Sequence, residues 1–390
     1  MDETDRYREL LQKSLLTEGW EDVFDYHRLS AWVQQNQERL RASARATLGD
    51  IASGHEDHFA DTVKTFSPRS KYDLPMTEAI FRPIFEGVAE CAREIGLQPL
   101  REVELVTSTS INPTPFARPT TGTHQLFIGP GIIAFCSYWA KAYTATAQAI
   151  AAEAPNKQII SPEDLKAPLA KDPSGILLAS RLCLYYAATG TLLGFGEVKQ
   201  PPNYLPLRME LLMAMEVFAL SHEYAHFLAD ERGLQLADES EEVSAEGLEH
   251  FCDAMGLQLS RFWGSKNDNL LAFSGAGGLA FFRAVETCEA CVAKLADVDS
   301  QVLAHVHSRS RQDIGQDSHP PLSERALNLI KWATENTEAD QKVLVESCLG
   351  QWDIICTTIR DYVSDILHEA AIAAKYDSLT DEPSATNRSS

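Results

Sequence analysis

Hydrophobic residues recur at the spacing of an amphipathic helix along most of this chain. Residues 75–95 show the pattern clearly, because Ile80, Ile84 and Val88 fall on one helical face. A second run, 207–230, is too apolar for a surface helix and is expected to be buried. Further helices are predicted at residues 132–152, 245–263, 280–295, 322–334 and 339–375.

Two short segments have the character of β-strands instead. Residues 102–107 alternate and are rich in β-branched side chains, and residues 124–128 form a second short apolar segment. Between them, 110–123 contains three prolines and many threonines, which is typical of turns. Residues 153–173 contain four prolines and are predicted to be a loop. The pattern predicts an α+β fold that is predominantly helical with a small sheet.

The apolar helix 207–230 contains the motif HEYAH, which begins at His222. His222 and His226 are four residues apart, so on a helix they share one face and both can bind one Zn²⁺. Glu223 would lie beside the metal and act as the general base toward water. Burying these side chains without partners is costly, and a metal removes that cost. The alternative is a pair of hydrogen-bonded core histidines with a partly exposed glutamate.

A third ligand is expected from the predicted helix 245–263. Glu249 and Asp253 are one turn apart, so Glu249 can bind the metal while Asp253 accepts the second ring N–H of a ligand histidine. Glu246 is the competing ligand, one turn earlier. Its own partner four residues on is His250, a less usual group in that supporting role. Glu249 is the preferred assignment, with Glu246 left open.

The motif HEYAH followed by EHFCD resembles the gluzincin metallopeptidases, which combine HExxH with a downstream ExxxD. The His-Pro-Pro segment that begins at His319, followed by Arg325, is similar to a segment of the Ste24/HtpX/Oma1-type peptidases. Residues 112–128 resemble the asparagine turn and edge strand that precede the metal helix in that group. The phage-exclusion peptidase Lit is similar in style and soluble. These short motifs lie within residues 112–330.

The resemblance implies a role for each matched segment. His319 would lie near the metal and help stabilise the oxyanion, although it can also be read as a plain loop histidine. Arg325 would hold its segment in place through a carboxylate. An edge strand would pair with an extended substrate by β-augmentation, and it comprises His124, Gln125, Leu126, Phe127 and Ile128.

The charge and composition of the chain limit the kinds of partner that we expect. The 390-residue chain has a net charge of −22 at pH 7, which repels nucleic acid and anionic membranes. The N-terminus lacks a secretory-signal pattern. Residues 175–196 approach the length of a membrane span, but they include Arg181 and four glycines and are expected to form a buried helix or hairpin. We therefore expect a cytoplasmic protein with no membrane span. Ste24-type proteins are usually membrane-embedded, so their substrate class is not carried over.

We expect a helical N-terminal cap or substrate-selecting region at 1–100, a zincin-like metallopeptidase domain at 101–375, and a disordered tail at 376–390. The expected function is that of a zinc metalloendopeptidase acting on a protein or peptide substrate. Two alternatives are a non-catalytic regulatory or interaction protein with a structural zinc, and a zinc hydrolase of a non-peptide amide. Glu223 argues against the first, because a structural site needs ligands but no base.

Overall fold

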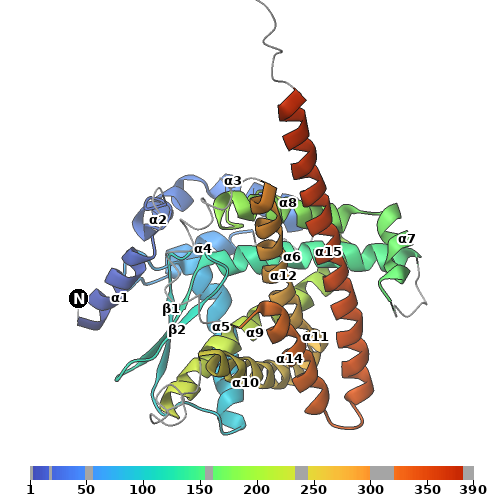
Figure 1. Cartoon of the computed structure of the whole chain (residues 1–390). Coiled ribbons are helices and arrows are strands. Elements are labelled where there is room, and N and C mark those ends of the chain that lie inside the picture. The colour runs from blue at the N-terminus through green and yellow to red at the C-terminus, as the bar shows by residue number, and fades with distance from the viewer. Residues whose placement is uncertain are drawn as a thin grey trace, which may run out of the picture.

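The computed structural model describes residues 3–16, 20–48, 56–153, 161–232, 245–298 and 320–380. This part of the chain is mostly helical with a small mixed sheet, as Figure 1 shows, and the predicted α+β class is confirmed. Of the tail predicted to be disordered, residues 376–380 instead belong to α15, and residues 381–390 lie outside the described part. The longer helices are α1 (Glu3–Ser14), α2 (Tyr26–Gln35), α3 (Gln37–Leu48), α4 (His58–Thr65), α5 (Pro75–Glu94), α6 (Pro130–Glu153), α7 (Glu163–Lys171), α8 (Ser174–Thr189), α9 (Leu205–Glu231), α10 (Ala245–Lys266), α12 (Ala276–Val298), α14 (Leu322–Glu335) and α15 (Lys342–Thr380).

The sheet places its strands in the order β1 (Val103–Thr107), β3 (His124–Ile128), β2 (Phe116–Arg118). The β1–β3 pair is parallel and the β2–β3 pair is antiparallel. The prediction that residues 124–128 form an edge strand is therefore wrong, because both sides of β3 are paired. The reason is a third strand between Pro115 and Pro119, too short to be recognised among turn residues. Within the described chain, β1 and β2 are the two edges of the sheet, because each pairs with β3 alone.

Strand alternation gives the sheet two different faces. Leu105, Leu126 and Ala117 are in register and share the inner face, which lies against α5 and α9. Glu104 and Arg118 belong to the opposite, outer face. The sheet thus separates the main helical core from the segment that covers its outer face, which is α1.

Helix α9 lies at the centre of the core, and every residue from 214 to 222 is buried. It packs against α5, α6, α10 and α12. Two glycines permit the closest approaches: a Cβ at Gly256 would lie 2.9 Å from the His222 Cα, and one at Gly277 would lie 2.5 Å from the Ala214 backbone. The predicted burial of this helix is confirmed, and Gly256 lets α10 lie close to the first histidine of the motif.

The predicted loop at 153–173 is in part wrong, because α7 forms within it. Leu165 and Leu169 lie one turn apart and are buried on the side that packs against α6, which stabilises a helix despite Pro168. The apolar stretch from Gly175 forms α8. None of the described helices combines the length and the apolarity needed to cross a bilayer. The division at residue 100 and the zincin-like character remain predictions.

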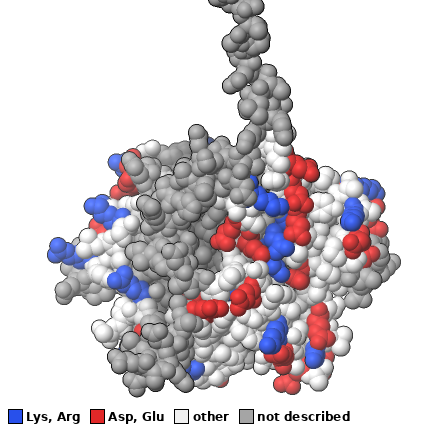
Figure 2. Space-filling view, viewed as in Figure 1, with Lys and Arg blue, Asp and Glu red and all other residues white. Residues whose placement is uncertain are grey.

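Acidic and basic side chains are interspersed on the face shown in Figure 2. Ion pairs between Arg360 and Glu286 and between Lys294 and Asp365 join α15 to α12. The C-terminal end of α15 extends past the other helices (Figure 1). The excess of negative charge is therefore not gathered into a single-sign surface on this face.

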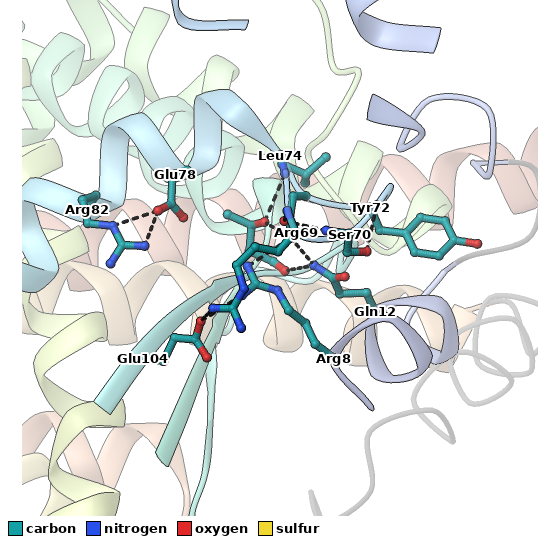
Figure 3. A network of polar contacts seen from close by, with 11 residues as sticks. Arg8, Gln12, Arg69, Ser70, Tyr72, Leu74, Glu78, Arg82 and Glu104 are labelled. Atoms are coloured by element: carbon teal, nitrogen blue, oxygen red, sulfur yellow. Dashed lines mark hydrogen bonds and ion pairs between the residues drawn. The ribbon is translucent and has the colours of Figure 1, made fainter. Parts of the chain in front are cut away.

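Helix α1 lies over the outer face of the sheet and is held by buried polar contacts (Figure 3). Asp73 is 1% exposed and accepts hydrogen bonds from Arg8 Nη2 at 3.1 Å and Gln12 Nε2 at 2.8 Å. Arg8 also donates to Glu104 at 2.9 Å, and Gln12 to the Thr107 carbonyl oxygen at 2.7 Å. These contacts fix the position of α1 relative to β1.

Replacing Asp73 with alanine should release α1. The change removes the acceptor shared by Arg8 and Gln12, and breaking a buried ion pair costs about 3 kcal/mol of unfolding free energy. Denaturant unfolding would measure the loss, and hydrogen exchange should be fastest in α1. Asp22→Ala is the matched control, since its ion pair with Arg28 is exposed and is worth less than about 1 kcal/mol. Equal losses in both variants would contradict the role of Asp73.

Candidate metal centre

Helices α9 and α10 bring three metal-ligating side chains together: His222, His226 and Glu249. The two histidine Nε2 atoms are 3.3 Å apart. Glu249 places Oε2 3.5 Å from His222 Nε2 and Oε1 3.7 Å from His226 Nε2. Glu249 itself is 6% exposed. The structure therefore contains a buried His-His-Glu group that can hold a metal ion.

The donor separations match the size of a zinc ion. Two ligands of a tetrahedral zinc, each bonded at ~2.0–2.1 Å, lie about 3.4 Å from one another. The observed separations of 3.3, 3.5 and 3.7 Å bracket this value. Two imidazoles and a carboxylate are also the donor set of many catalytic zinc sites. The residues present thus fit the implied ion.

A buried ion pair between Asp253 and Arg325 holds the His222 ring of this group in position. His222 Nδ1 lies 2.9 Å from Asp253 Oδ1, which orients the ring so that Nε2 points toward Glu249. Asp253 in turn accepts two hydrogen bonds from Arg325 of α14, at 2.7 and 2.6 Å. Arg325 Nη2 also lies 3.3 Å from Glu249 Oε2. Arg325 therefore contacts the carboxylates of the site, and α14 contributes to it.

The pKa values of the two histidines shift in opposite directions. Burial lowers the pKa of His226, and the neighbouring His222 lowers it further, so its ring is neutral and ready to ligate. Burial also disfavours the charged form of His222, but hydrogen bonds with Asp253 and Glu249 outweigh this and raise its pKa. Metal binding must therefore displace a proton from His222.

Glu223 lies beside this group and contacts the sheet. Its Oε2 accepts a hydrogen bond of 2.8 Å from the Ala117 N–H of β2. Burial raises the pKa of Glu223 to about 7, against the opposing charge of His222 and with the added effect of Glu249. The donor in this contact is a backbone N–H, so no residue type in the sequence predicts it. The only related prediction was a strand in the segment that precedes α9.

Glu246 lies outside the buried group. It is exposed and belongs to a second set with His250 and Glu324, whose possible ligand atoms lie within 4.8 Å of one another. His319 lies outside the described residues, and its expected role stays a prediction. His124 is buried in the sheet, where it stacks on Phe227 with ring centroids 4.8 Å apart.

Comparisons of the chain with models of protein families, with curated proteins and with solved structures found no match. The site is therefore interpreted from its own geometry.

The purified protein should hold about one strongly bound metal ion per chain, which we expect to be zinc. Removing His222 or His226 by substitution with alanine takes away one of the neighbouring donors and should abolish this binding. Metal analysis after washing with a weak chelator would measure occupancy. Full occupancy in either variant would contradict the site.

Glu249→Ala should weaken metal binding far more than Glu246→Ala, because Glu249 lies with the two histidines whereas Glu246 faces His250. Asp253→Asn should be intermediate, since losses of a supporting partner typically cost ~10–100-fold in affinity or activity. Competition with a chromophoric chelator would place all variants on one affinity scale. A greater defect in Glu246→Ala would move the third ligand by one helical turn.

Proposed function

We propose that the protein is a zinc-dependent metallopeptidase of the gluzincin type. The observation that carries the proposal is the position of Glu223. Its carboxylate lies beside the His-His-Glu group and is hydrogen-bonded to the edge strand β2. A general base, a metal-ligating group and a strand edge are the three parts that hydrolysis of an extended peptide needs.

Zinc, when bound, would supply Lewis acidity to the substrate carbonyl. Glu223 would carry out the proton transfers, and its pKa is raised to about 7, close to neutral pH. Its Oε2 would accept a proton from the attacking water and return that proton to the leaving amine. Arg325 and Asp253 would keep the His222 ring in the orientation that ligation requires.

The edge of β2 that faces away from β3 would position the substrate. Ala117 lies opposite Leu126, and its N–H points away from β3 to Glu223. In an antiparallel ladder the carbonyl of such a residue points the same way as its N–H. A substrate strand pairing here would take over the Ala117 N–H and so release Glu223 Oε2 for proton transfer. The edge strand expected at residues 124–128 is thus replaced, in this proposal, by β2.

The same arrangement weighs against the two alternatives. A structural zinc does not need a further, half-buried carboxylate such as Glu223 beside its ligands, and a non-peptide amide does not need a strand edge. Nucleic acid is not a proposed partner, because the net charge of −22 opposes its binding. The proposed partner is a protein or peptide that can present an extended segment.

Glu223→Gln should retain the metal and lose turnover. The amide preserves the size of the side chain but cannot accept a proton, and loss of a general base costs typically 10²–10⁴-fold. New termini in a cell lysate incubated with zinc-loaded protein would report cleavage, and metal analysis of the same sample would report occupancy. A variant that cleaves as fast as the wild-type protein would exclude this mechanism.

A further inference from the structure

We propose that Arg118 selects peptides that carry an acidic side chain close to the scissile bond. This inference rests on the proposed peptidase function and on pairing of the substrate with β2. It assigns a specificity role to a residue outside the motif and outside the metal group.

Arg118 is the last residue of β2. It follows Ala117 directly, and it pairs across the strand with Gln125, so its side chain lies on the outer face. Phe116 shares this face and stacks on Phe127 with ring centroids 4.8 Å apart. Side chains of neighbouring strands at the same register lie next to each other on one face. A substrate strand beside β2 would therefore place one of its side chains next to Arg118.

The positive charge of Arg118 favours an acidic partner. Other arginines around the sheet have carboxylate partners: Arg8 and Arg69 pair with Glu104, and Arg101 pairs with Asp230. Within the described residues, no ion pair joins Arg118 to a carboxylate. In a chain with a net charge of −22, an uncompensated cation at the substrate edge is a local exception that attracts an acidic group.

An aromatic ring of α1 holds the Arg118 guanidinium in place. Its central carbon lies 5.0 Å from the ring centroid of Tyr7 on α1. A cation–π contact uses the face of the guanidinium and leaves its N–H donors in the plane available. Those donors can bind a carboxylate through two parallel hydrogen bonds. An amide of the same shape is neutral and is bound more weakly.

Helix α1 completes the arrangement. Tyr7 precedes Arg8, whose ion pairs with Asp73 and Glu104 fix α1 over the sheet. The ring is thereby kept over Arg118 although Tyr7 itself is 39% exposed. The N-terminal helix thus takes part in substrate selection through this ring.

The test is digestion of a peptide library derived from a whole proteome by the zinc-loaded, full-length protein. Cleavage sites of the wild-type protein should show Asp or Glu enriched at one position within about three residues of the cleaved bond. For a matched pair of peptides with Glu or Gln there, kcat/KM should differ by about 10-fold, the size of one charge-assisted hydrogen bond. Arg118→Gln should abolish the preference, and Arg118→Glu should reverse it toward Lys and Arg.

Arg181→Gln is the matched control. Arg181 is also an arginine over an aromatic ring, 5.4 Å from the Phe195 centroid, but it lies on α8 and is exposed, whereas Arg118 is half-buried. This variant should keep the acidic preference. Binding of the Glu and Gln peptides to the Glu223→Gln variant, followed by fluorescence anisotropy, should show the same discrimination without turnover.

The outcomes separate the two proposals. Cleavage without acidic enrichment, or an enrichment that persists in Arg118→Glu, would overturn the role of Arg118 and leave the peptidase function standing. Loss of folding stability in Arg118→Gln with an unchanged sequence preference would show that the contact with Tyr7 is purely structural. An absence of any zinc-dependent cleavage that Glu223→Gln abolishes would overturn the peptidase function, and this inference with it.

Discussion

The buried ion pair between Asp253 and Arg325 is the interaction on which the candidate site depends. Both charges are removed from water, with side-chain exposures of 0% and 8%, and such burial is tolerated only with close and complete hydrogen bonding. Arg325 meets this need with two bonds to Asp253 and a stacking contact 4.7 Å from the Phe282 ring centroid. Asp253 then orients His222. Three helices, α14, α10 and α9, are thereby joined at the point where the metal-ligating atoms converge.

Much of this arrangement follows from the sequence because it is local. The spacing of His222 and His226 places both rings on one helical face whatever the rest of the fold does. Glu249 could be preferred to Glu246 because Asp253 lies one turn beyond it, and the structure indeed places Glu249 with the two histidines. The apolar run around the motif correctly predicted a buried helix.

What could not be predicted depends on contacts between distant segments. Strand β2 consists of three residues between two prolines, and it exists because β3 supplies its hydrogen-bonding partner. The pairing also turned the segment 124–128 from an expected edge into the centre of the sheet. Helix α7 was not predicted because prolines are unfavourable in helices, and its stability comes from packing against α6. Ala117 contributes a backbone N–H, and Arg118 belongs to no motif, so neither leaves a pattern in the sequence.

The chemistry of Glu223 links the metal group to the sheet. Burial raises the pKa of Glu223 to about 7, and the charge of Glu249 adds to this effect. Glu249 and Asp253 carry two negative charges, and Arg325 offsets one of them. A divalent cation among these groups would leave the surroundings of Glu223 net positive and would favour its carboxylate form. The residues that would hold the ion would therefore also favour the ionised form of Glu223 that the proposed mechanism requires, and the Ala117 N–H holds this carboxylate at the edge of β2.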